Sequence, residues 1–155
     1  MVIQRWQSVL LFIGAVVMAC FTFIPFGQVT TDDYTFNLSA LGFYQAGEPT
    51  DGSAPIVIHT WYFFILSLTT IVLLLLDIFL YSNLRLQMRI CMVCLLFIVA
   101  DACVGGLLGF CRIDNGQIWW NTVSLCPFIA IFSTVFAYNR MKADYTLLKS
   151  ADRLR

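Results

Sequence analysis

Four long apolar blocks, separated by polar connections, dominate the pattern of this chain. They cover residues 6–26, 56–81, 90–111 and 118–138. At about 1.5 Å per residue, a helix of about 20 residues crosses the hydrocarbon core of a bilayer. The pattern therefore predicts an all-α membrane protein built as a four-transmembrane-helix bundle, with all 155 residues in a single membrane domain.

The first connection, residues 27–55, is polar and contains four acidic residues but no lysine or arginine. Within it Tyr34, Phe36 and Leu38 alternate with polar residues, and residues 47–55 are rich in turn formers. Alternation with period two is typical of a half-exposed strand. We therefore expect a short β-hairpin in this loop.

The later connections are short. Residues 82–89 join the second and third blocks and predict antiparallel neighbouring helices. Residues 111–117 include Asn115-Gly116, which suits a tight turn, and Trp119 and Trp120 are expected in the fourth helix at the headgroup level.

The C-terminal tail, residues 139–155, has no helix breaker and should extend the fourth helix. Its apolar residues recur at helical spacing, which predicts an amphipathic extension. These residues are Met141, Tyr145, Leu148 and Ala151.

Basic residues gather at one end of the predicted bundle, with Arg112 alone at the other. The positive-inside rule then predicts that both termini are cytoplasmic and that residues 27–55 lie outside, which is the periplasm in a bacterium. The basic residues at the terminal end are Arg5, Arg85, Arg89, Arg140, Lys142, Lys149, Arg153 and Arg155.

Composition supports a membrane protein and excludes other classes. The chain is 60% hydrophobic and only 12% charged, and its formal net charge is zero. Mean hydropathy is +0.83, so the lipid bilayer is the expected surrounding. The charge balance does not favour nucleic acid as a partner. The first block lacks a signal-peptidase pattern and is expected to stay in the membrane.

The third block carries one charge near its centre, Asp101, which shares a helical face with Gly105 and Gly109. The two glycines form a small-xxx-small pair, which lets another backbone approach closely. Ser67 and Thr70 fall at a similar depth in the second block. A contact between Asp101 and either hydroxyl is therefore expected.

An ionisable residue inside a membrane is a functional candidate, so Asp101 and Asp77 allow two interpretations. They could form a proton or ion site, or they could serve packing. We favour packing, with Asp101 hydrogen-bonded to Ser67 or Thr70 and Asp77 paired with an arginine of the following connection.

The six cysteines suggest redox or metal chemistry. Cys91 and Cys94 are expected to be packing residues near the cytoplasmic end. Cys20, Cys103 and Cys126 should lie at similar depths and could form one thiol layer. A disulfide between two of them is the less favoured outcome. Neither a metal site nor a cofactor is predicted.

Both ends of the chain carry distinctive motifs, IQRWQS at Ile3–Ser8 and LLKSADRLR at Leu147–Arg155. With the four-block plan, they resemble a family of short four-helix bacterial membrane proteins known as a domain of unknown function. The resemblance implies the inner membrane of a Gram-negative bacterium and brings no activity. The expected cytoplasmic contacts with a partner are Arg5, Asp152, Arg153 and Arg155.

Three functional hypotheses follow. The leading one is a non-enzymatic inner-membrane scaffold or accessory subunit with a membrane or cytoplasmic protein partner, because the chain has no catalytic motif beside its distinctive ends. The second is a small proton- or solute-coupled permease or channel using Asp101. The third is a thiol redox protein using Cys20, Cys103 and Cys126.

Overall fold

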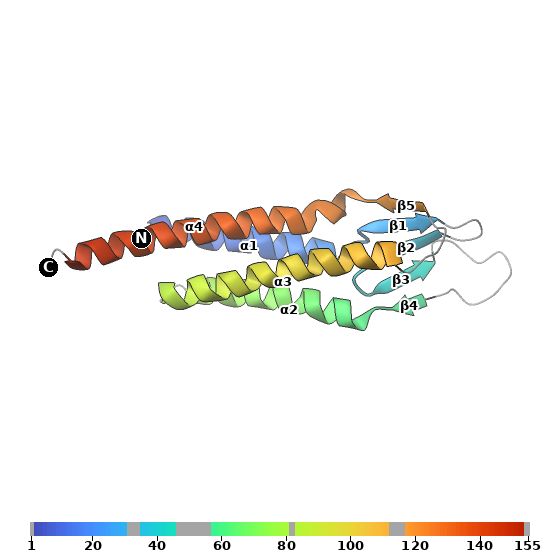
Figure 1. Ribbon diagram of the computed structural model, residues 1–155, viewed down its shortest axis with the longest axis horizontal. Coiled ribbons are helices and arrows are strands. Elements are labelled where there is room, and N and C mark those ends of the chain that lie inside the picture. Colours follow the sequence, from blue (N-terminus) through green and yellow to red (C-terminus); the bar gives the residue numbers. More distant parts are fainter. Residues whose placement is uncertain (1, 31–34, 46–56, 81–82, 112–116, 154–155) are drawn as a thin grey trace.

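The computed structural model describes residues 2–30, 35–45, 57–80, 83–111 and 117–153. Four long helices run along the molecule, and both termini lie at one end, which we call the terminal end (Figure 1). Strands occupy the opposite end, the sheet end. The helices are α1 (Val2–Phe23), α2 (Trp61–Phe79), α3 (Leu84–Cys111) and α4 (Cys126–Arg153).

The strands form one antiparallel sheet in the order β4-β3-β2-β1-β5. The predicted loop 27–55 supplies β1, β2 and β3 rather than a single hairpin, and β4 comes from the start of the predicted second block. The segment between α3 and α4 adds β5, whose Trp120 is paired with Gly27 of β1. The strands are β1 (Gly27–Thr30), β2 (Thr35–Ser39), β3 (Gly42–Gln45), β4 (Val57–His59) and β5 (Gln117–Trp120).

Two helices begin later than predicted. α2 begins at Trp61 rather than at residue 56, because Val57–His59 form the strand β4. Residues at the start of the expected 118–138 helix instead form β5 and a short 3-10 turn, Thr122–Leu125, so that α4 begins at Cys126. The prediction for Trp119 and Trp120 was therefore wrong. Apolar, aromatic and β-branched residues suit a strand as well as a membrane helix, and pairing with β1 decides between them.

α3 is longer than predicted, and α4 includes the predicted extension. α3 begins at Leu84 rather than at residue 90, and α4 continues without interruption to Arg153. The predicted helical extension of the tail is therefore confirmed. At the sheet end α1 stops at Phe23, two residues before Pro25, which has no backbone N–H to continue it.

Hydrogen bonds join the sheet to the helices. The N–H of Phe26 donates to the carbonyl of Leu38 at 2.9 Å, and the N–H of Asn121 donates to the carbonyl of Phe26 at 3.0 Å. The Thr60 hydroxyl, just before α2, donates to the carbonyl of Ala40 at 3.0 Å. The helix ends and the sheet therefore form one unit.

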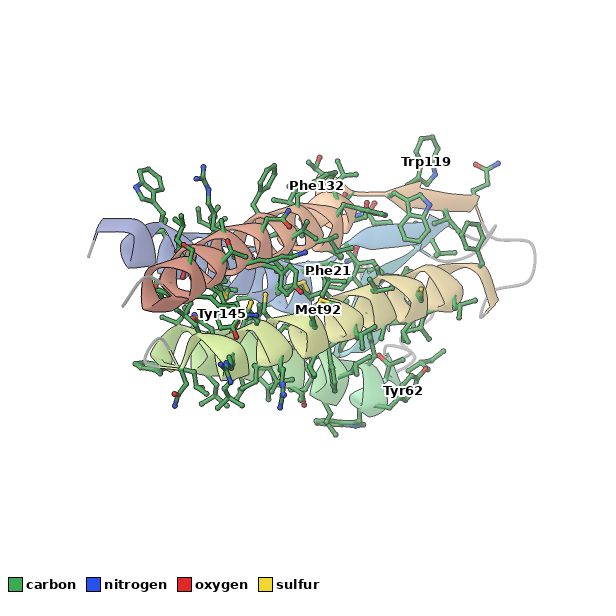
Figure 2. The ribbon with its side chains drawn as sticks, turned by 60° about the vertical axis from the view of Figure 1, so that its left-hand side comes forward. Phe21, Tyr62, Met92, Trp119, Phe132 and Tyr145 are labelled. Carbon is green, nitrogen blue, oxygen red and sulfur yellow. The ribbon has the colours of Figure 1, made fainter. Side chains whose placement is uncertain are left out.

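Each helix packs against two others, in the ring α1–α2–α3–α4–α1. Large side chains such as Phe21 are buried inside it, while Phe132 and Trp119 point outward (Figure 2). Four stretches are long and apolar enough to cross a membrane, one for each helix, and the last also includes the 3-10 turn before α4. They are Trp6–Phe23, Trp61–Phe79, Leu84–Phe110 and Thr122–Ser150. The exposed apolar faces are the surfaces that lipid would cover.

Three phenylalanines fill the bundle below the sheet, and we call them the aromatic plug. The Phe21 and Phe26 rings stack at 5.1 Å between centroids, and Phe63 meets each of them edge-on at 6.0 Å. All three side chains are buried. The plug closes the sheet end of the bundle with well-packed apolar rings.

Candidate functional site

A set of buried polar residues follows the inner faces of α2 and α3, and we call it the polar core. On α2 the buried face includes Ser67, Thr70 and Asp77, and on α3 it includes Gln87 and Asp101. Buried polar groups in an apolar bundle must find partners within the protein. Their hydrogen bonds therefore determine what this region can do.

Both carboxyl oxygens of Asp101 have a hydrogen-bond partner. Its Oδ1 accepts a hydrogen bond from the Ser67 hydroxyl at 3.1 Å, and its Oδ2 accepts one from the Thr70 hydroxyl at 2.6 Å. The predicted contact is therefore confirmed, with both hydroxyls rather than one. The two bonds tie α2 to α3 near the middle of the bundle.

Asp77 does not form the predicted pair with an arginine. It is completely buried, and neither carboxyl oxygen has a hydrogen-bond partner among the described residues. The expected pairing with Arg85 or Arg89 is wrong, because the α2 face that carries Asp77 turns inward while both arginine side chains are exposed. An unpartnered buried polar group costs about 1–3 kcal/mol, and more when it is charged.

The surroundings of Asp77 come from α3. The Gln87 side-chain amide donates to the backbone carbonyl of Asp77 at 3.2 Å, leaving the carboxyl group itself free. Cys91 and Cys94 are buried close to it, and the Cys91 thiol approaches the carbonyl of Thr134 on α4 at 3.7 Å. Asp77 is thus a carboxyl group among thiols and one amide.

The glycines of α3 make room for rings rather than for a helix backbone. A Cβ on Gly105 would lie 3.2 Å from the Phe21 ring, and one on Gly109 would lie 2.8 Å from the Trp120 ring. The prediction that these two glycines admit another helix backbone was therefore wrong, because they face aromatic side chains instead. Trp120 comes from β5, whose position the pattern did not predict.

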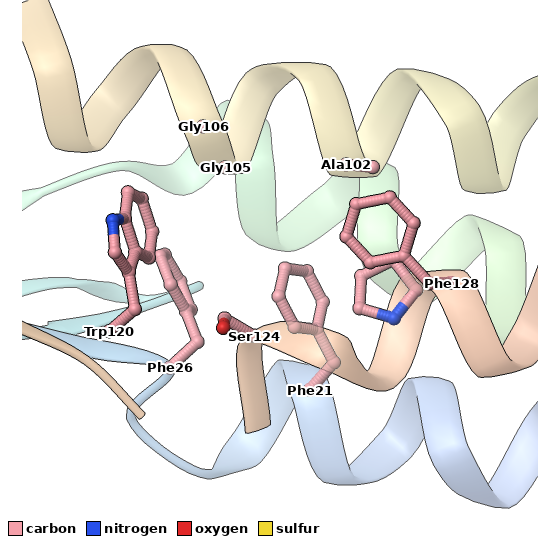
Figure 3. A pocket seen from close by; sticks show the side chains of 9 residues that line it. Phe21, Phe26, Ala102, Gly105, Gly106, Trp120, Ser124 and Phe128 are labelled. Atoms are coloured by element: carbon pink, nitrogen blue, oxygen red, sulfur yellow. The ribbon is translucent and has the colours of Figure 1, made fainter. Parts of the chain in front are cut away.

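A cavity of about 210 Å³ lies between Gly105 and Gly106 of α3 and the start of α4 (Figure 3). Its lining is mainly aromatic and small, and Gly106 faces open space. The lining residues are Phe21, Phe26, Ala102, Gly105, Gly106, Trp120, Ser124, Pro127 and Phe128. With one hydroxyl and no ionisable group, the cavity offers packing space rather than chemistry.

Of the three candidate thiols, the structure brings Cys20 and Cys126 close to each other. Cys20 and Cys103 are exposed on the outer surface of the bundle, while Cys126 is half-buried at the start of α4. All three are free thiols. Among the described residues, no three His, Cys, Asp or Glu side chains come together in a way that could hold a metal ion.

The candidate terminal contacts lie partly outside the described residues. Arg5 is in α1 and Asp152 and Arg153 are in the last turn of α4, so their backbones lie at the terminal end, whereas Arg155 falls outside the described residues. The proposed partner contacts of these residues remain predictions.

Two contacts between α1 and α4 were not predicted. The Gln7 amide donates to the carboxylate of Asp144, and a Cβ on Gly14 would lie 3.0 Å from the Ser133 hydroxyl. Small residues on both helices were a usable signal for the close approach. The pairing of the first helix with the last, however, depends on tertiary structure that the pattern does not encode.

The described helices define an integral, multi-pass membrane protein that carries a five-stranded sheet at one end. Within that class, the sequence matches the family described as "Domain of unknown function (DUF4293)" over residues 3–154, and the chain belongs to this family. The resemblance inferred from its two ends is thereby confirmed. A comparison with curated proteins gives no match.

Proposed function

We propose that this protein is a non-enzymatic scaffold or accessory subunit of a membrane assembly. The observation that carries the proposal is the sheet, which the segments between α1 and α2 and between α3 and α4 build together at one end of the bundle. It gives a small membrane protein a folded surface in the aqueous phase. Beneath it the aromatic plug closes the bundle, which disfavours an open pathway along the helix axis.

Among the large apolar side chains of the described strands, Trp119 on the edge strand β5 has the highest exposed fraction, 64%. Tryptophan is enriched at the centres of protein interfaces because it buries a large area at a small entropic cost. We therefore place the partner contact at this side chain. The location we propose is a bacterial inner membrane with both termini in the cytoplasm, supported by the distribution of basic residues.

The test is affinity purification from native membranes in mild detergent, followed by mass spectrometry. The proposal expects a stoichiometric partner with the wild-type chain and at least a tenfold loss of that partner with Trp119→Ala. Gln28→Ala, which changes the exposed cross-strand neighbour of Trp119, is the matched control. A wild-type protein that purifies alone contradicts the scaffold proposal.

A second function, a small proton- or solute-coupled permease, is favoured by one observation. Asp77 is a buried carboxyl group without a partner, about 10 Å along α2 from Thr70 of the polar core. Liposomes containing the purified protein and a pH-sensitive dye test this function. Proton flux that disappears with Asp77→Asn or Asp101→Asn supports the permease, and flux equal to that of empty liposomes rejects it.

A further inference from the structure

A groove between α3 and α4 at the terminal end combines positive charge with apolar side chains. Its volume is about 420 Å³, and Figure 2 shows Tyr145 and Met92 along the same seam. The lining residues are Arg85, Met88, Arg89, Met92, Tyr138 and Tyr145. This groove lies on the outer surface of the bundle at the end opposite the sheet, whereas Gln87 of the polar core, between the two arginines in the sequence, is buried.

The two arginines lie one turn apart on α3, so both guanidinium groups lie on the same side of the helix. Both side chains are exposed, and neither has an ion-pair partner among the described residues. The Arg85 guanidinium lies 5.5 Å from the ring centroid of Tyr145. This cation–π contact orients the group while leaving N–H donors available to an anion.

Neither nearby carboxylate forms an ion pair with these arginines among the described residues. Asp144 on α4 accepts a hydrogen bond from Gln7 of α1, and Asp77 on α2 is completely buried. The groove therefore presents two guanidinium groups and two tyrosine rings without a facing acid among the described residues. Its chemistry fits a phosphate group, which guanidinium binds with paired hydrogen bonds.

The position of the groove along the membrane span indicates that the phosphate belongs to a lipid headgroup. About 20 residues counted back from Phe110, the sheet-end limit of the α3 span, cross the hydrocarbon core and reach Ile90. Arg85 and Arg89 then lie at headgroup level. Met92 lies about 10 Å deeper than Arg85, within reach of an acyl chain.

We propose that this groove binds an anionic phospholipid, with its phosphate on Arg85 and Arg89 and one acyl chain along Met88 and Met92. Basic pockets between helices at headgroup level are suited to this class of ligand. The arrangement of charge above apolar surface matches a phospholipid and not a free phosphate ion.

The experiment uses the full chain in detergent, with lipid binding followed by native mass spectrometry and by thermal stability. Phosphatidylglycerol is expected to stay bound and to raise the melting temperature. Phosphatidylcholine and inorganic phosphate at the same concentration are expected to do neither. Equal binding of phosphatidylcholine, or an equal effect of inorganic phosphate, overturns the proposal.

Arg85→Gln/Arg89→Gln should weaken phosphatidylglycerol binding about tenfold or more and remove its salt dependence. Lys142→Gln/Lys149→Gln removes the same charge from exposed positions of α4 outside the groove and should leave binding within twofold. An equal loss in both variants means general attraction and overturns the site. Arg85→Lys/Arg89→Lys keeps the charge and should retain part of the binding. This partial binding shows that the loss in the Gln variant comes from the missing charge and not from misfolding.

Discussion

Asp101 and Asp77 show two different ways of burying a carboxyl group in an apolar bundle. Asp101 accepts one hydrogen bond at each oxygen, from Ser67 and Thr70, so its position is stabilised by the residues around it. Asp77 has no such partner among the described residues, and its burial costs stability. A residue that weakens the fold in this way is a candidate for function.

Asp101→Asn is expected to lower the free energy of unfolding in detergent by about 1 kcal/mol, because the amide keeps one acceptor and must lose one of the two accepted bonds. If Asp101 serves packing, complementation of a deletion strain should remain close to normal. A stable variant that fails to complement would favour the proton- or solute-coupled alternative.

Asp77→Asn should change stability in the opposite direction. A neutral amide is less costly to bury than a carboxylate without a partner, so the melting temperature in detergent should rise or stay unchanged. Thermal unfolding of both Asn variants in the same detergent makes the comparison. A loss of stability as large as that of Asp101→Asn means that Asp77 has a partner.

At the scale of elements, α3 shows how a single helix can carry glycines with different roles. Gly109 makes room for the Trp120 ring of β5, whereas Gly106 one turn earlier faces open space. The same substitution at the two positions therefore meets different surroundings. Because Gly109 also lies in the last turn of α3, the sign of each effect, rather than its size, reports the packing.

Gly106→Ala is expected to stabilise the protein by up to about 1 kcal/mol, because alanine is the better helix former. Gly109→Ala is expected to destabilise it, because the new Cβ would lie 2.8 Å from the Trp120 ring and push β5 away. Thermal unfolding of the two purified variants in one detergent measures both effects. Equal shifts would contradict the packing of Trp120 on α3.

Gly42 in β3 holds a second close contact between elements. Its φ of +150° is unfavourable for other residues, and a Cβ there would lie 2.2 Å from the carbonyl oxygen of Ile58 in β4. Gly42→Ala should separate β4 from the sheet, raising hydrogen exchange at Val57–His59. Gly27→Ala, whose Cβ would have only ordinary contacts, is the control and should leave exchange there unchanged.

For the whole molecule, the positions of the helices were more predictable than the sheet. Four apolar blocks were enough to predict the bundle, and the depths of Ser67, Thr70 and Asp101 were enough to predict their contact. The strand β5 was not predictable in this way, because Gln117–Trp120 is as apolar as a helix start and its partner β1 lies far away in sequence. Asp77 was misjudged for a related reason, since depth along a helix does not decide which neighbours a buried face meets.

The topology is tested with single cysteines at Ser39 and Ser150 in a cysteine-free background. Both described residues lie at opposite ends of the molecule, in β2 and near the end of α4. An impermeant reagent added to intact cells should label Ser39→Cys and spare Ser150→Cys. The reverse pattern means that the sheet lies in the cytoplasm.

The pairing of β1 with β5 has a consequence for how the chain is made. Strands β1 to β4 all precede α2 in the sequence, but β5 follows α3. One edge of β1 therefore has no neighbouring strand until most of the chain has been synthesised. The same delay applies to α1, one of whose flanks is covered only by α4. The helices α1 and α2 with strands β1 to β4 must therefore persist in the membrane as an incomplete intermediate. The unpaired edge of β1 in this intermediate could pair with strands of other chains.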